Sequence, residues 1–119
     1  MKGPTTIGFV SLTLLSLASE AAERGILGER TRLAYVRLRE KLAAWANSDA
    51  TIFDETHMPD SRRRRIIDAI ELCPTDDRGT VRSMARALAE SLRQDVLRGS
   101  IGISLRRLEE LDAQLRALP

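Results

Sequence analysis

Apolar residues recur every three or four positions along most of this chain, which is the spacing of helices with one or more buried faces. The most apolar stretch is "IGFVSLTLLSLASEAA", residues 7–22. Helical geometry gives it two apolar stripes, which lie about 120° apart. They consist of Ile7, Val10, Leu14, Leu17 and Ala21, and of Leu12, Leu15 and Ala22. This stretch therefore predicts a helix that is buried on two sides.

The same stretch has two other interpretations. A membrane span needs roughly 20 apolar residues, and serines and a threonine interrupt this shorter run, so we do not expect it to cross a bilayer. A secretory signal would use Lys2 as its basic region, residues 7–18 as its apolar region and "ASEA" as its cleavage site. A single lysine is a weak basic region. A secreted helical protein with an N-terminal signal stays an alternative, and we favour a cytoplasmic protein.

The second predicted helix, residues 29–45, has two apolar faces. Gly25 and Gly28 mark a break before it. The two faces consist of Thr31, Tyr35, Leu38, Leu42 and Trp45, and of Leu33, Val36 and Ala43. A helix with two apolar faces is either central or has one face in the core and the other at a partner.

The remaining pattern predicts three further helices and no strand. After a polar connector with one expected helical turn at residues 49–54, Asp60 or Ser61 caps a helix that ends near Cys73. A fourth helix covers residues 77–98, with Gly99 as its stop. Ser104 caps the last helix. We therefore predict one all-α domain over residues 1–119, a compact bundle of four to five helices with a core at 7–98 and a C-terminal amphipathic helix at 104–119.

Composition agrees with a helical core and narrows the function. Aromatic residues make up only 3% of the chain, so leucine, isoleucine, valine and alanine must fill the interior. With 19 basic and 17 acidic residues, the net charge of +2 does not require a nucleic acid partner. Cys73 is the only cysteine, which excludes an intrachain disulfide and agrees with a reducing cytoplasm.

No catalytic or cofactor-binding motif accompanies the reactive residues. His57 is the only histidine and lies in a polar connector, and Cys73 ends an apolar helical face. One cysteine and one histidine do not make a zinc site, and the chain has no phosphate-binding glycine loop. We therefore predict a non-enzymatic protein without a metal or cofactor.

Arginines form the sharpest charge feature. Four of them, Arg62, Arg63, Arg64 and Arg65, follow one another at a helix start, where the helix dipole disfavours cations. With Arg78, Arg82 and Arg86 of the next helix, they would frame a basic groove for an anion or a nucleic acid. The simpler interpretation pairs Arg64 and Arg65 with Asp68 and leaves the others in solvent.

The last helix is the leading candidate for a protein interface. Its leucines recur at positions that would anchor it in a groove or against a second copy: Leu105, Leu108, Leu111 and Leu115. The alternative is that this row docks on the protein's own bundle. Leu33 and Val36 form a second candidate anchor row. The expected partner is a protein or a second copy of the chain, in a homo-oligomer.

The order of features also resembles a known module. The small-residue apolar helix is followed by "YVRLREKL", then by "MPDSRRRRIIDAI", an acidic turn and "VRSMARALAESL", so the resemblance covers roughly residues 7–98. This is similar to effector-associated helical domains of bacterial conflict (antiphage) systems. The matching residues are Tyr35, Leu38, Leu42, Pro59, Ser61, Arg65, Asp77, Val81, Ala85 and Leu88. The resemblance implies an adaptor or assembly role beside an effector, rather than catalysis.

Overall fold

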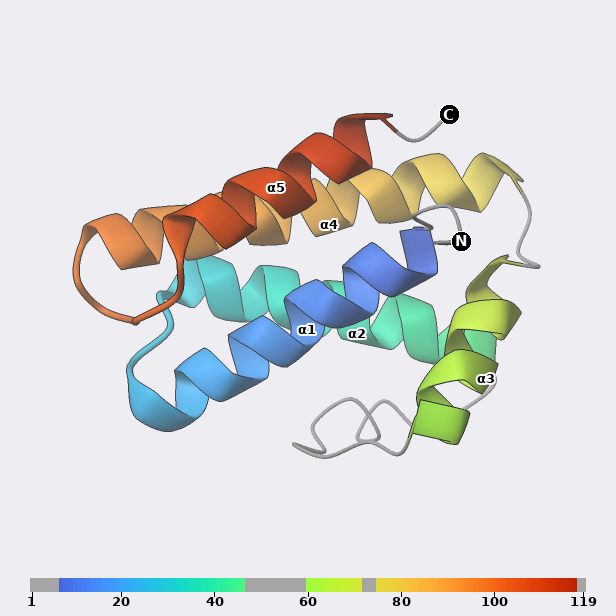
Figure 1. Ribbon diagram of the computed structural model, residues 1–119, viewed down its shortest axis with the longest axis horizontal. Coiled ribbons are helices and arrows are strands. Elements are labelled where there is room, and N and C mark those ends of the chain that lie inside the picture. Colours follow the sequence, from blue (N-terminus) through green and yellow to red (C-terminus); the bar gives the residue numbers. More distant parts are fainter. Residues whose placement is uncertain (1–6, 47–59, 72–74, 118–119) are drawn as a thin grey trace.

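The computed structural model of the protein describes residues 7–46, 60–71 and 75–117, and these ranges fold into five helices (Figure 1). The helices are α1 (Ile7–Arg24), α2 (Glu29–Ala46), α3 (Asp60–Glu71), α4 (Thr75–Leu97) and α5 (Leu105–Ala117). No strand occurs in these ranges, so the predicted all-α bundle is confirmed. The turn expected at residues 49–54 lies outside the described residues.

Helix α1 is the centre of the bundle. It contacts each of the other four helices, and α2 runs antiparallel to it (Figure 1). Both predicted stripes point inward along most of the helix, since Val10, Leu14 and Leu15 are almost completely buried, whereas Leu17 is half-buried and Ala22, at the C-terminal end, is exposed. The predicted helix with two buried sides is therefore confirmed. Neither α1 nor any other described helix combines the length and the apolar character that a bilayer-spanning segment requires.

Helix α3 lies at one end of the bundle, where it packs closely against the start of α1. A Cβ atom at Gly8 would lie 3.2 Å from the carbonyl oxygen of Ile67, so the two backbones approach within van der Waals contact there. The backbone N–H of Gly8 donates to Glu71 Oε1 at 3.1 Å. This carboxylate satisfies a free N–H group in the first turn of α1, where the helix dipole favours negative charge.

The loops between α1 and α2 and between α4 and α5 meet at the opposite end (Figure 1). A Cβ atom at Gly25 would lie 2.5 Å from the carbonyl oxygen of Ser100, so only glycine fits there. Gly99 adopts a φ of 77°, and the backbone bonds from Gly99 to Val96 and from Ser100 to Asp95 form a Schellman motif. The predicted stop at Gly99 is confirmed, as is the cap of α5, since Arg107 N donates to Ser104 Oγ.

The N-terminus of α2 is capped from α4 and not from its own segment. Asp95 is only 2% exposed, and its Oδ2 accepts a hydrogen bond of 2.9 Å from the backbone N–H of Gly28. A Cβ atom at Gly28 would lie 2.8 Å from Asp95 Oδ1, so a larger residue there would displace the carboxylate. The buried carboxylate therefore joins α4 to the start of α2 through a charge-assisted bond.

We expect Asp95→Ala to lower the free energy of unfolding by about 2 kcal/mol, because the cap of α2 is lost and the partly buried N–H group of Gly28 loses its partner. Thermal or urea unfolding followed by circular dichroism measures this change. Glu90→Ala on the exposed side of α4 is the control and should change stability by less than about 0.5 kcal/mol. Equal stability of the two variants would contradict the cap.

Candidate functional site

The predicted leucine row of α5 serves the fold itself. Leu108, Leu111 and Leu115 are buried in the hydrophobic core, and only Leu105 remains half-buried. Helix α5 lies antiparallel along α4 and also contacts α1, and these neighbours cover its apolar face (Figure 1). These three leucines are therefore covered by the protein's own bundle, as the alternative interpretation predicted. The prediction that they anchor a partner is corrected.

The second predicted anchor row remains at the surface. Leu33 is 50% exposed, and Val36 is half-buried where it packs against the core. Because the two residues are three positions apart on α2, they are neighbours on the helix surface. Each lines a different groove, Leu33 the one between α2 and α4 and Val36 the one between α1 and α2. We call these two grooves together, including Leu33 and Val36, the α2 surface.

The groove between α2 and α4 is the larger of the two, with a volume of about 880 Å³. It lies between the first turns of α2 and the C-terminal half of α4. Its charges are mixed, and they belong to Glu29, Arg30, Glu90, Asp95 and Arg98. The buried carboxylate of Asp95 already accepts the Gly28 N–H and has the Arg98 guanidinium at 3.9 Å. The groove therefore offers an apolar edge at Leu33 with charges of both signs.

The groove between α1 and α2 has a volume of about 410 Å³ and a different chemistry. Apolar side chains make up most of its lining, among them Ile26, which is 75% exposed. The charged residues that line it are Arg32 and Arg39, and the Arg39 guanidinium lies 5.4 Å from the centre of the Tyr35 ring. This groove is apolar with a positive edge.

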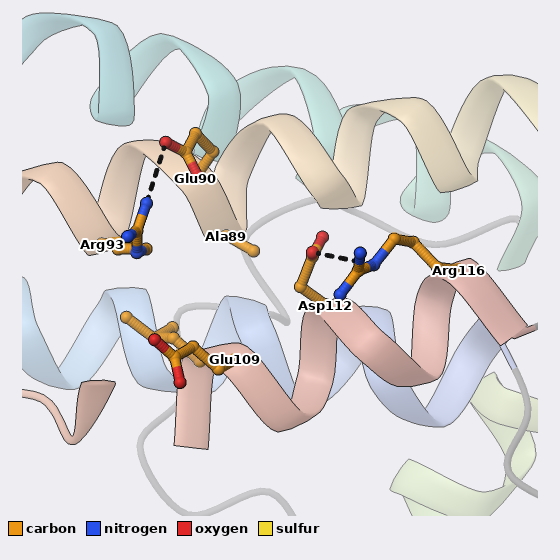
Figure 2. Close-up of a pocket in the computed structure, with 7 residues that line it drawn as sticks. Ala89, Glu90, Arg93, Glu109, Asp112 and Arg116 are labelled. Carbon is orange, nitrogen blue, oxygen red and sulfur yellow. Dashed lines mark hydrogen bonds and ion pairs between the residues drawn. The ribbon is translucent and has the colours of Figure 1, made fainter. Parts of the chain in front are cut away.

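A third groove, between α4 and α5, holds charges that pair with one another (Figure 2). Arg93 lies 3.5 Å from Glu90 on α4, and Arg116 lies 3.3 Å from Asp112 on α5. Figure 2 shows each arginine turned toward the carboxylate of its own helix. This groove has a volume of about 330 Å³, and three carboxylates (Glu90, Glu109 and Asp112) and two guanidinium groups line it, so it has no excess of positive charge to attract an anion.

The predicted basic groove is not formed by free arginines of α4. The Arg78 guanidinium donates to the backbone carbonyl of Glu71 and lies 3.3 Å from its carboxylate. Arg86 Nε donates to Asp112 Oδ1 at 3.2 Å. Arg82, half-buried between them on the same side of α4, also has an interaction partner. The expectation of an open basic groove along α4 is corrected, because α3 and α5 bring carboxylates to Arg78 and Arg86.

The arginine run at the start of α3 is divided between packing and solvent. Arg63 lies over the Phe9 ring at 5.9 Å, and its guanidinium donates to Thr13 Oγ1 at 3.3 Å, which ties α3 to α1. Arg62, Arg64 and Arg65 are exposed. The structure therefore gives Arg63 a packing role, and the interpretation that left Arg63 in solvent is corrected.

No group of three or more histidine, cysteine or acidic residues that could hold a metal is found in the described ranges. His57 and Cys73, the reactive residues singled out in the sequence, lie outside those ranges, so their surroundings are not described.

Two residues of the α2 surface escape the sequence pattern. Asp95 lies three positions after Leu92, so it falls on the apolar stripe of α4. An acidic residue at such a position indicates a buried carboxylate, and Asp95 is buried. Ile26 and Leu27 lie next to one another between Gly25 and Gly28, and nothing in their spacing indicates that Ile26 is exposed and Leu27 buried.

Comparison with family models, with curated proteins and with solved structures found no match for this chain.

Proposed function

We propose that this protein is a non-enzymatic, cytoplasmic interaction module that binds a protein partner or a second copy of itself through the α2 surface. Its role is that of an adaptor or an oligomerising subunit. The resemblance to effector-associated helical domains of bacterial conflict systems supports the same kind of role. In this proposal α5 completes the bundle, and α2 presents the binding face.

Leu33 is the observation that carries the proposal. Half of this leucine is exposed on a helix whose opposite side, at Leu38 and Leu42, is completely buried. The fold therefore already has its buried face on α2, and Leu33 contributes little to it. An exposed leucine beside two grooves supplies the anchor and the concave surface that interface cores use.

We expect Leu33→Asp to abolish binding while leaving the fold intact, because a carboxylate at the centre of an apolar contact stays unpaired on binding. Light scattering across a range of concentrations measures self-association, and quantitative capture from the native host measures partner binding. Leu97→Asp is the matched control, since Leu97 is 58% exposed but lines none of the three grooves. If Leu33→Asp and Leu97→Asp behave alike in both measurements, the proposal is wrong.

A further inference from the structure

The groove between α1 and α2 differs from the other two in the sign of its charge. Arg32 and Arg39 line it, and no carboxylate does so among the described residues. The groove between α2 and α4 and the groove between α4 and α5 both include glutamate and aspartate. An apolar surface with charge of one sign selects partners with the opposite charge, because a like charge would be repelled and an uncharged partner would gain no attraction.

The apolar part of this groove is held rigidly. Ile26 exposes 75% of its surface, yet its backbone N–H donates to the carbonyl oxygen of Ser100 at 3.1 Å. Gly25 before it packs against the loop between α4 and α5, and Leu27 after it is buried in the core. The loop therefore fixes an exposed isoleucine in one place, and a preorganised contact of this kind lowers the entropic cost of binding.

The positive edge lies along the same side of α2. Arg32 and Arg39 are seven residues apart, which places them about two turns from one another on one face. Tyr35 and Val36 lie between them and line the groove. Arg39 also lies over the Tyr35 ring, which limits the positions that its guanidinium can take.

We propose that this groove binds an acidic amphipathic helix of a partner protein, an inference that rests on the proposed function. Apolar side chains of that helix, at i, i+3, i+4 spacing, would enter the groove beside Ile26 and Val36. Its glutamates or aspartates would lie against the exposed guanidinium of Arg32. We propose a helix because the groove runs beside α2. Rows of side chains on a second helix can pack into the spaces between the rows of side chains on α2.

Two other classes of partner fit the groove less well. A single-stranded nucleic acid would need an accessible ring for its bases to stack on, but Tyr35 is buried, and a duplex would need more phosphate-binding cations than the two arginines that line this groove. An anionic membrane surface would need a protruding apolar face, whereas these side chains line a hollow of about 410 Å³. A concave apolar surface matches the projecting side chains of a peptide.

The test uses the full chain and two fluorescent amphipathic helical peptides, identical except that one carries glutamate where the other carries glutamine. Fluorescence anisotropy should show the glutamate peptide binding about tenfold more tightly, with an affinity that falls as salt screens the arginines. Arg32→Glu should weaken binding of that peptide about tenfold. Arg106→Glu, at an exposed arginine outside the groove, should leave it unchanged.

Ile26→Asp should weaken binding of both peptides, whereas Leu97→Asp should not. Circular dichroism shows whether Ile26→Asp is folded. If Ile26→Asp does not fold, the effect of Arg32→Glu on binding of the glutamate peptide decides whether the groove is the binding site. Equal binding of the two peptides, no binding of either, or equal effects of Arg32→Glu and Arg106→Glu would each overturn the inference. Binding to phosphatidylglycerol vesicles without binding to the glutamate peptide would also overturn it. Capture and light scattering of Leu33→Asp are measured separately. The proposed function can therefore hold even if the peptide experiment overturns the inference about the acidic helix.

Discussion

Leu14→Asp should leave the protein unfolded. Leu14 is fully buried at the centre of α1, the helix that contacts all the others. The substitution removes a leucine side chain whose loss alone costs about 2–5 kcal/mol, and it adds a buried carboxylate without a partner, which costs several kcal/mol more. Together these losses match the entire stability of an ordinary domain, about 5–15 kcal/mol.

Far-ultraviolet circular dichroism at room temperature measures this result directly. We expect a loss of most helical signal and no cooperative melting transition. Leu97→Asp is the control, because it makes the same chemical change at an exposed position of α4 and should melt within a few degrees of the unchanged protein. A cooperative transition for Leu14→Asp at the temperature of the control would show that α1 is peripheral, and it would revive the interpretation of this segment as an export signal.

Removal of residues 104–119 should have the second largest effect. Helix α5 contributes Leu108, Leu111 and Leu115 to the core, and its absence would expose the side of α4 and α1 that they cover. At about 1.5–3 kcal/mol for each fully buried leucine, the loss is comparable with the stability of the domain. The truncated chain should bind a hydrophobic dye, aggregate and lose its sharp melting transition.

The full-length variant Glu110→Ala is the control for this truncation, because Glu110 is exposed on the outer side of α5. Its melting temperature should stay close to that of the unchanged protein. If the truncated chain melts cooperatively at the same temperature as Glu110→Ala, then α5 is an appendage and its leucines are available to a partner after all.

The sequence predicted the helices well because their signals are local. The double stripe of α1, the stop at Gly99 and the cap at Ser104 each depend on residues within a few positions of one another. The leucine row of α5 was harder to interpret, because a helical period shows which face is apolar and not what covers that face. The same pattern serves a core helix and a partner-binding helix.

The arginines of α4 illustrate the same limit for charge. Their spacing places Arg78, Arg82 and Arg86 on one side of the helix, as the sequence predicted. Their partners Glu71 and Asp112 come from α3 and α5, so the pairing depends on how the helices pack. The cap of α2 by Asp95 was missed for the same reason, since 67 positions separate Asp95 from Gly28.

Photocrosslinking in living cells of the native host tests the central claim, that the α2 surface is the binding face. A photoreactive phenylalanine replaces Leu33 in one variant and Leu97 in another, and adducts are identified by mass spectrometry. We predict abundant crosslinked protein for the variant at position 33 and little for the variant at position 97. An adduct of twice the chain mass would identify a second copy as the partner. Equal adducts at both positions, or none at position 33, would contradict the account.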